Sequence, residues 1–228
     1  MMQVNSRVPS SAQDGVHVQL TTLVAKHLAA PFLKPYADYN RRAADESLAR
    51  YARRGAGAPL ILDACCGVGE SSIALARAFP DHYVIGVDQS ADRLARRIAD
   101  KSAERLPENV DLVRADLVDY WRLLQAEGVR LARQYLLYPN PWPKIGHLAR
   151  RWHGHPVFPS MLALGGDFEC RSNWPIYVEE MARAITLATG RDVVVEAYAP
   201  EPTQVLTPFE RKYLASGHAL SRLRVALP

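Results

Sequence analysis

Residues 60–70, which read LILDACCGVGE, decide the fold of this chain together with VIGVD at residues 84–88. In the first stretch an apolar strand runs into a turn of small residues and then into a helix, so the backbone can approach a ligand closely. In the second stretch Asp88 ends a strand, where its carboxylate suits the two hydroxyls of a ribose. Together they predict a site for a nucleoside cofactor at the carboxyl edge of a parallel sheet.

The turn departs from the glycine-rich fingerprint of dinucleotide-binding proteins. Cys65 stands where a first glycine is usual, and Asp63 precedes the turn. That carboxylate would repel a pyrophosphate and attract the ammonium and sulfonium groups of S-adenosylmethionine, directly or through ordered waters. The residues therefore favour S-adenosylmethionine over NAD, although a glycine turn alone also occurs without such a ligand. The predicted cofactor-binding residues are Asp63, Cys65, Gly67, Gly69, Asp88, Gln89, Asp116 and Leu117.

Length and composition indicate one domain with an N-terminal extension. With 228 residues, two ordinary domains would be crowded. The net charge of +4 suits an anionic partner such as RNA, but a solvated basic surface gives the same balance.

The three cysteines are Cys65, Cys66 and Cys170, an odd number without a disulfide framework, so we expect a reduced, cytoplasmic protein. Cys65 and Cys66 suit apolar filling of a tight strand end, with a redox pair as the alternative. We expect no membrane partner, because no apolar run is long enough to cross a bilayer and the N-terminus lacks the apolar centre of a signal peptide.

The first 57 residues are predicted to precede the cofactor domain. Residues 1–15 are rich in polar residues and are typical of a flexible tail. Residues 16–57 predict a helical lid or arm, with apolar residues at helical spacing up to Leu28 and a second helix at residues 37–53. The arginines of the second helix suit a partner-binding arm and a solvated helix face equally well; they are Arg41, Arg42, Arg50, Arg53 and Arg54.

Strands and helices alternate through residues 58–228. This order predicts an α/β fold with a doubly wound, seven-stranded, Rossmann-like sheet, helices on both faces and an antiparallel edge strand. The expected strands are residues 60–64, 82–88, 110–114, 134–138, 166–171, 193–198 and 220–226. The expected helices lie near residues 70–79, 91–101, 117–127, 159–164 and 175–187.

A proline-rich loop, YLLYPNPWPK at residues 135–144, leaves the fourth strand beside the expected cofactor site. Its three prolines stiffen the backbone, so it can hold an amide and an indole at fixed positions. Asn140 is the predicted catalytic residue, since it can accept a hydrogen bond from an amine or ring N–H, and Trp142 can stack on a base. Transfer of a methyl group to nitrogen requires mainly that the acceptor is oriented and desolvated. An ordinary turn with a buried anchor tryptophan is the alternative.

Basic side chains follow this loop, namely Lys144, His147, Arg150, Arg151, His153 and His155. The lysine and the two arginines could position an RNA backbone through its phosphates. A capped, partly buried loop explains the same residues about as well. A histidine metal site is the least favoured interpretation, because no carboxylate or thiolate lies at convincing spacing.

The ordered motifs resemble those of the bacterial tRNA (guanine-N7-)-methyltransferases, a family of class I S-adenosylmethionine-dependent methyltransferases. The resemblance covers residues 60–217 and rests on PNPWPK at 139–144, His147, Arg150 and Arg151, the pair Gly165 and Gly166, SNW at 172–174 with Tyr177, and TPFE at 207–210. It implies a methyltransferase fold, transfer to a nitrogen and tRNA as a partner. Carried over by position, it implies cofactor binding by Asp63, Asp88 and Asp116, catalysis by Asn140, substrate binding by Lys144 and Asn173, and closure of the site by Thr207 and Glu210.

Both substrate-side carboxylates of that family are amides in this chain, at Asn140 and Asn173. An asparagine lacks the charge that stabilises a methylated guanine ring, and it donates as well as accepts hydrogen bonds. We therefore expect guanine N7 of tRNA as the leading acceptor, with a small-molecule amine or heterocycle as its rival. Another use of S-adenosylmethionine and a non-catalytic RNA-binding role are further alternatives.

Two of these motifs also have a structural interpretation. Thr207 and Glu210 form the capping box of a helix start, which is compatible with a role in the site. Trp174 and Tyr177 are expected to pack against the sheet end, with Asn173 pointing to the ligand.

Overall fold

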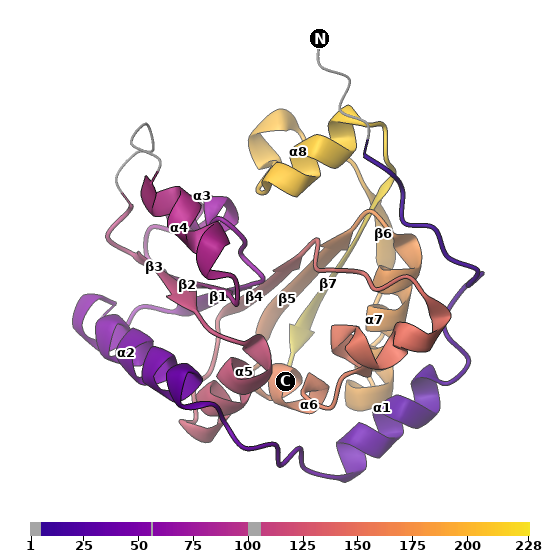
Figure 1. The fold of residues 1–228 in the computed structure, drawn as a ribbon, viewed down its shortest axis with the longest axis horizontal. Helices are drawn as coiled ribbons and strands as arrows, with labels where there is room; N and C mark the ends of the chain where they lie inside the picture. The colour runs from indigo at the N-terminus through magenta and orange to yellow at the C-terminus, as the bar shows by residue number, and fades with distance from the viewer. Residues whose placement is uncertain (1–5, 56, 100–105) are drawn as a thin grey trace.

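The computed structural model describes residues 6–55, 57–99 and 106–228. Its seven strands form one sheet in the order β3-β2-β1-β4-β5-β7-β6 (Figure 1). The strands are β1 (Leu60–Ala64), β2 (Tyr83–Asp88), β3 (Val110–Arg114), β4 (Arg133–Leu137), β5 (Gly166–Ser172), β6 (Val195–Tyr198) and β7 (Leu220–Leu227). Neighbours from β3 to β5 are parallel, while β7 is antiparallel to both β5 and the outermost β6. The expected α/β sheet with an antiparallel edge is confirmed.

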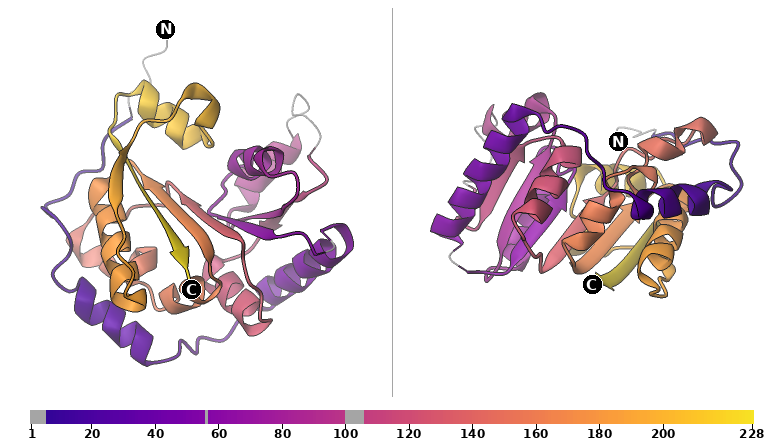
Figure 2. Two further views of the ribbon diagram at one scale, coloured as in Figure 1. Left: turned by 180° about the vertical axis from the view of Figure 1, so that it is seen from behind. Right: turned by 90° about the horizontal axis from the view of Figure 1, so that it is seen from below.

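Helices cover both faces of the sheet (Figure 2). On one face lie α1 (Leu20–Ala29), α2 (Asp38–Arg54), α5 (Leu117–Ala126), α6 (Phe158–Ala163) and α7 (Pro175–Thr189). On the other lie α3 (Glu70–Ala78), α4 (Ala91–Ala99) and α8 (Pro208–Ala215). Three short 3₁₀ helices are η1 (Ile145–Arg150), η2 (Trp152–Gly154) and η3 (Pro202–Gln204). Because the crossovers after β1 and β2 run in one direction and those after β3, β4 and β5 in the other, α3 and α4 fall on the face opposite to α5, α6 and α7.

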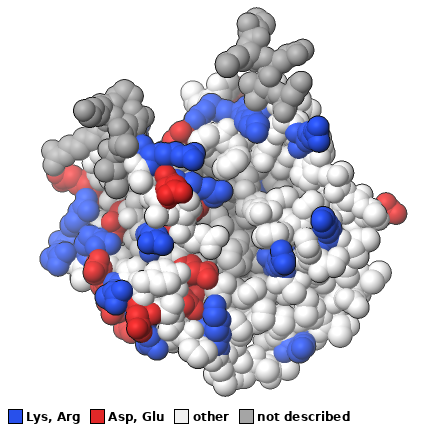
Figure 3. Space-filling model, viewed as in Figure 1, with Lys and Arg blue, Asp and Glu red and all other residues white. Residues whose placement is uncertain are grey.

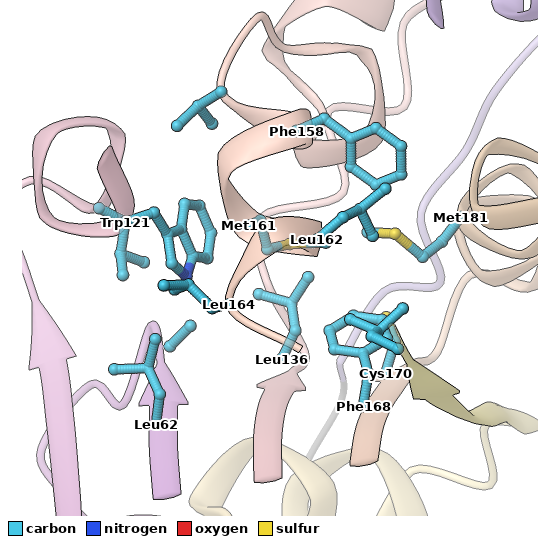
Figure 4. Packing of buried hydrophobic residues seen from close by; sticks show 14 of the residues in the cluster. Leu62, Trp121, Leu136, Phe158, Met161, Leu162, Leu164, Phe168, Cys170 and Met181 are labelled. Atoms are coloured by element: carbon cyan, nitrogen blue, oxygen red, sulfur yellow. The ribbon is translucent and has the colours of Figure 1, made fainter. Parts of the chain in front are cut away.

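Two apolar clusters form the core, one on each side of the sheet. In the larger cluster Trp121 of α5 and Phe158 of α6 pack over Leu136 and Phe168 of the central strands (Figure 4). The smaller cluster joins β1, β4 and β7 to α3, and the Tyr213 ring of α8 packs against it. In the described part of the chain, no helix combines the length and apolar character that a membrane span needs.

Helix α2 packs beside α5 and β3. The Asn40 amide donates to Asp119 Oδ2 at 2.7 Å and accepts from the Asp116 N–H at 2.9 Å. The hydroxyls of Ser47 and Tyr120 are 2.8 Å apart, and both residues are buried. Helix α2 is therefore part of the core layer, rather than a separate arm.

Two of the arginines assigned to a partner-binding arm have partners within the fold. Arg50 forms an ion pair of 2.8 Å with Asp111 of β3, and Arg54 donates to the Glu108 carbonyl.

The N-terminal segment runs along the body of the protein from α8 towards α1 (Figure 1). Residues 6–15 contain no helix or strand, but their side chains bond to distant elements. The Ser11 hydroxyl donates to the Pro143 carbonyl at 2.6 Å, and the Gln13 amide donates to Glu180 at 2.6 Å. Residues 1–5 of the expected tail lie outside the described residues.

Substitution of Gly86 tests the contact between β2 and α3. A Cβ atom there would overlap Ser72 Oγ and crowd the Leu112 side chain. We expect Gly86→Ala to lower the free energy of unfolding by about 1–3 kcal/mol, as overpacking does, measured by urea denaturation. Gly146→Ala is the control, because Gly146 has open space and an ordinary φ, and should change stability by less than about 0.5 kcal/mol. Equal losses in the two variants would contradict this interpretation.

Candidate functional site

A cavity of about 760 Å³ opens at the carboxyl edge of the sheet. Its lining includes eight predicted site residues, namely Cys65, Asp88, Gln89, Asp116, Leu117, Asn140, Trp142 and Arg150. The space-filling view shows the surface hollowed in this region, with Lys and Arg side chains near the rim (Figure 3). A cavity of this size suits a small-molecule ligand with most of its surface buried.

The turn between β1 and α3 has three residues with left-handed backbone. Gly67 and Gly69 have φ of 62° and 83°, and Cys65 has φ of 64° although it carries a side chain. This conformation costs a non-glycine residue about 1 kcal/mol or more, and such strain often marks ligand sites. Burial raises the pKa of the Cys65 thiol to about 12, so the thiol stays protonated and is a poor redox partner for Cys66.

Asp63 lies beneath this turn and is only 1% exposed, so it does not line the cavity. Its Oδ2 accepts from the hydroxyls of Ser71 and Ser72, both at 2.6 Å. Its Oδ1 is buried without a hydrogen-bond partner among the described residues, and burial raises the pKa of the carboxyl to about 6. An unsatisfied buried acceptor at this point fits a cationic amino group, or a water that such a group orders.

Two carboxylates face the cavity from the ends of neighbouring strands. Asp88 accepts from the backbone N–H groups of Gly67 at 3.0 Å and Ser90 at 2.8 Å, which fixes its orientation. Asp116 caps α5 by accepting from the Val118 N–H at 2.9 Å through one oxygen. Each carboxylate keeps acceptor capacity, which fits the hydroxyls of a ribose and the amino group of an adenine. The residues of this half of the cavity thus fit S-adenosylmethionine.

The loop after β4 forms the other half of the cavity. Tyr138 and Trp142 have left-handed backbone, with φ of 51° and 46°. The Asn140 Oδ1 accepts from the Trp142 N–H at 3.3 Å, and the Arg150 guanidinium lies 4.8 Å from the centre of the Trp142 ring. Exposed Asn140, half-buried Trp142 and exposed Arg150 thus form a compact group beside the cofactor half.

The structure corrects the assignment of Arg151 as a phosphate-binding residue. Its side chain is fully buried and pairs with Glu180 at 2.6 Å. It also donates to the backbone carbonyls of Trp142 at 3.2 Å and Lys144 at 3.3 Å. Because these bonds use its guanidinium, Arg151 cannot reach an RNA phosphate, and it holds the loop instead.

His153 is also buried, and its ring lies at hydrogen-bond distance, 2.8 Å, from Glu180. This contact agrees with the alternative interpretation of these residues as a partly buried loop. No group of three metal-binding side chains occurs among residues 6–55, 57–99 and 106–228. Lys144 is exposed and outside the cavity lining, so only its backbone carbonyl takes part in this network.

Glu210 does not face the cavity, contrary to its assignment as a substrate-binding residue. It is fully buried and accepts from the Tyr138 hydroxyl at 2.7 Å and from Arg171 at 2.9 Å. Thr207 is also buried, and its hydroxyl accepts from the Glu210 N–H as the N-cap of α8. The Glu210 side chain completes the helix start by accepting from the Leu206 N–H at 2.7 Å. Both residues therefore act on the site indirectly, through Tyr138 and α8.

The prediction that Asn173 points to the ligand is wrong. Its side chain is 5% exposed, lies 3.1 Å from His218 Nδ1 and does not line the cavity. Trp174 and Tyr177 are buried against the sheet, as expected.

Four aromatic cavity residues were not among the predicted ones, namely Tyr138, Trp152, Phe209 and Tyr213. Phe209 is 42% exposed at the start of α8, and its place in the TPFE motif was the signal that the sequence offered for it. His155, considered above as a metal ligand or as part of a partly buried loop, also lines the cavity. Its Nδ1 accepts from the Val157 N–H at 3.1 Å, so the neutral ring carries its proton on Nε2.

Comparisons with known proteins agree on a methyltransferase. Residues 57–223 match a family model described as "Putative methyltransferase". The tRNA (guanine-N(7)-)-methyltransferase of Nocardioides sp. is 32% identical over 171 residues, which cover 73% of this chain and 66% of that protein. The protein of the same name from Saccharophagus degradans is 32% identical, with 73% and 74% covered. The chain thus matches about two thirds to three quarters of the length of these relatives.

Solved structures show the same fold. The 16S rRNA methyltransferase KamB has a TM-score of 0.58 at 20% identity, with 85% of this chain and 95% of that chain covered. A 16S rRNA (adenine(1408)-N(1))-methyltransferase variant from Catenulisporales acidiphilia, solved with its cosubstrate, has a TM-score of 0.54 at 18% identity, with 81% and 91% covered.

Asp88→Ala tests the cofactor half of the cavity. The variant loses an acceptor for the ribose and the bond that fixes Gly67, so we expect affinity for S-adenosylhomocysteine to fall by about 100-fold or more in calorimetry. Asp92→Ala is the matched control, since Asp92 is exposed on α4 and outside the cavity lining. Retained affinity in Asp88→Ala would contradict this placement of the ribose.

Glu180→Gln tests the buried network by its pH dependence. Although burial alone would raise it, hydrogen bonds and charges from His153 and Arg151 lower the pKa of Glu180 to about 2. Because the folded state lowers this pKa, the ionised carboxylate stabilises the fold. The stabilisation is fully present when the pH is above the ordinary pKa of 4.5, and it is lost as the pH falls towards 2. We expect Glu180→Gln to cost about 3–5 kcal/mol at pH 7, because it leaves Arg151 buried without a counter-charge.

The gap between wild type and Glu180→Gln should narrow as the pH falls below about 4.5, measured by urea denaturation at several pH values. Glu179→Gln, at the neighbouring half-buried position, should change stability by less than about 0.5 kcal/mol. A gap that stays constant from pH 7 to pH 3 would show that Glu180 is not the ionised centre of this network.

Proposed function

Because this chain belongs to the methyltransferase family whose model spans most of its length, we propose that it methylates a nitrogen of an RNA base, with tRNA as the substrate. The chain is an S-adenosylmethionine-dependent methyltransferase. The names of its relatives, together with the geometry of the acceptor half of the cavity, support the extension to tRNA.

One observation supports the proposal: the residues that fit the cofactor and a group of side chains suited to stack on a base share one cavity. Asp88 and Asp116 line one part, while Asn140, Trp142 and Arg150 line the other. The volume of about 760 Å³ lies in the upper part of the range for ligand sites, so it leaves room beside a nucleoside cofactor for a second planar ring.

The residues of the loop after β4 suit the orientation of such a ring. S-adenosylmethionine, when bound, supplies an electrophilic methyl group on a sulfonium. The Trp142 indole, with the Arg150 guanidinium over it, offers a face for stacking, and the Asn140 amide offers hydrogen bonds to the edge of the ring. A stacked, desolvated base with a fixed edge presents its lone pair in one direction, which is the main requirement for methyl transfer.

Exposed basic side chains near the cavity suit an RNA backbone. Arg150 lines the cavity, Lys144 lies on the same loop, and Lys212 lies on α8, whose Phe209 and Tyr213 also line the cavity. Contacts of this kind bind phosphates and fix the register without reading the sequence. They also make binding depend on salt, which distinguishes an RNA from a small neutral acceptor.

Arg150→Glu tests the RNA substrate. We expect tRNA affinity to fall about tenfold and the slope of log K against log salt to decrease by about 1, because one phosphate contact is lost. Affinity is measured by fluorescence anisotropy from 50 to 300 mM salt. Arg191→Glu is the control: Arg191 follows α7 at the opposite edge of the sheet and should keep wild-type affinity. Salt-independent tRNA binding, or none, would favour a small-molecule acceptor instead.

A further inference from the structure

The N-terminal segment at residues 6–15 lies against the body of the protein without a core of its own (Figure 1). None of these residues is buried, and Val8 is 58% exposed. Hydrogen bonds to distant elements fix the segment, and such bonds each contribute little to the stability of a fold. The anchor points therefore indicate where the segment acts. They lie next to two aromatic walls of the cavity, at Tyr213 of α8 and at Trp142 of the loop after β4.

The first anchor lies in the turn after α8. Tyr213 lines the cavity, and the His218 ring is stacked on it, with the ring centres 5.3 Å apart and an angle of 14° between the planes. His218 Nε2 lies 2.9 Å from the Ser6 carbonyl oxygen, and since a carbonyl only accepts, Nε2 carries a proton. In the neutral ring, Nδ1 then accepts from the Asn173 amide at 3.1 Å. Both ring nitrogens are thus bonded, which fixes the ring that packs on Tyr213.

The second anchor lies in the loop, directly after its indole. The Ser11 hydroxyl donates to the Pro143 carbonyl at 2.6 Å. Arg151 donates to the carbonyls on either side, those of Trp142 and Lys144. Three consecutive carbonyls of the loop are therefore occupied, the middle one by the N-terminal segment. These bonds fix the backbone that carries the indole.

Gln13 joins the second anchor to the buried network. Its amide nitrogen donates to Glu180 at 2.6 Å, and its amide oxygen accepts from Arg151 at 3.1 Å. The amide thus bridges the two members of the buried ion pair. The segment that holds Pro143 is thereby bonded to the same guanidinium that holds its neighbours.

The two walls come from elements that are far apart in the sequence. Tyr138 links the start of the loop to α8, because its hydroxyl donates to Glu210. The N-terminal segment links the end of the loop to the turn after α8, since it bonds both Pro143 and His218. The acceptor half is thus tied to α8 at both ends of the loop.

We propose that residues 6–13 are a strap that positions the Trp142 and Tyr213 walls for the acceptor base, with Ser11 and His218 as positioning residues. This inference rests on the proposed RNA methyltransferase activity. A base gains stacking energy only where an aromatic face is correctly placed, so loosening of either wall weakens base binding. The carboxylates of the cofactor half are held by the turns at their own strand ends, so they keep their orientation when the strap is released.

Ser11→Ala tests the strap. The variant loses the bond to Pro143, so KM for total tRNA should rise about two- to tenfold, while kcat stays within about twofold, measured by transfer of label from S-adenosylmethionine. Affinity for S-adenosylhomocysteine should stay unchanged in calorimetry. Ser10→Ala is the matched control, since Ser10 is exposed at the neighbouring position, and should keep the wild-type KM. Equal KM values in the two variants overturn the inference and leave the proposed function intact.

Hydrogen exchange separates positioning from a loss of stability. In Ser11→Ala we expect the amides of residues 138–144 to exchange severalfold faster than in Ser10→Ala, because the loop opens more often. The midpoint of urea denaturation should be nearly the same in both variants, since the strap lies outside the core. A lower midpoint with unchanged exchange in the loop would show a structural role alone and overturn the inference.

His218→Phe tests the other anchor. Phenylalanine keeps a ring on Tyr213 but loses the bonds to Ser6 and Asn173, so KM should rise by a similar factor. Because one strap joins both anchors, the double variant with Ser11→Ala should raise KM by less than the product of the single effects. A full product would show independent anchors and overturn the strap. Wild-type protein that binds the cofactor but labels no RNA overturns the proposed function, and this inference with it.

Discussion

The acceptor half of the site depends on the ion pairs and hydrogen bonds of the buried Glu180 carboxylate. It is fully buried and pairs with Arg151 and His153, and it also accepts from the Gln13 amide and the His17 N–H. A buried charge of this kind is tolerated only when its lone pairs are satisfied. Arg151 in turn donates to the carbonyl of Trp142, so the loop that carries the catalytic candidate is held from outside the cavity. The N-terminal segment belongs to the same network, which makes it part of the support of the site.

This support explains how the loop keeps a strained backbone. Tyr138 and Trp142 both adopt left-handed φ, which costs about 1–3 kcal/mol each and persists only where the surroundings over-determine it. Tyr138 is held through its hydroxyl by Glu210, and Trp142 through its carbonyl by Arg151. Two buried carboxylates on different elements, α8 and α7, thus offset the strain at the two ends of one short segment. The strain places Asn140 and the indole beside the cofactor half of the cavity.

The sequence predicted the features that depend on local pattern. The strands, the turn at Cys65 and the placement of Asp88 follow from short stretches, because a strand end positions its own residues. The errors concern polar residues whose partners are distant along the chain. Arg151, Glu210 and Asn173 were assigned to substrate by motif, yet their partners lie 29, 39 and 45 residues away. A motif shows what a side chain can bond, and the fold decides with which group it does so.

These corrections leave base selection to very few groups. The aromatic walls, Trp142, Trp152, Phe209 and Tyr213, can stack on any base, and stacking contributes about 1–3 kcal/mol with little preference for the sequence. In the proposed complex, basic residues on the rim would contact phosphates, which carry no information about the base. Discrimination must therefore come from polar groups that face the ring edge, where a mismatched donor or acceptor leaves a desolvated group unpaired. In this cavity the side chains of Asn140, Gln89 and His155 carry donors or acceptors that can serve this task.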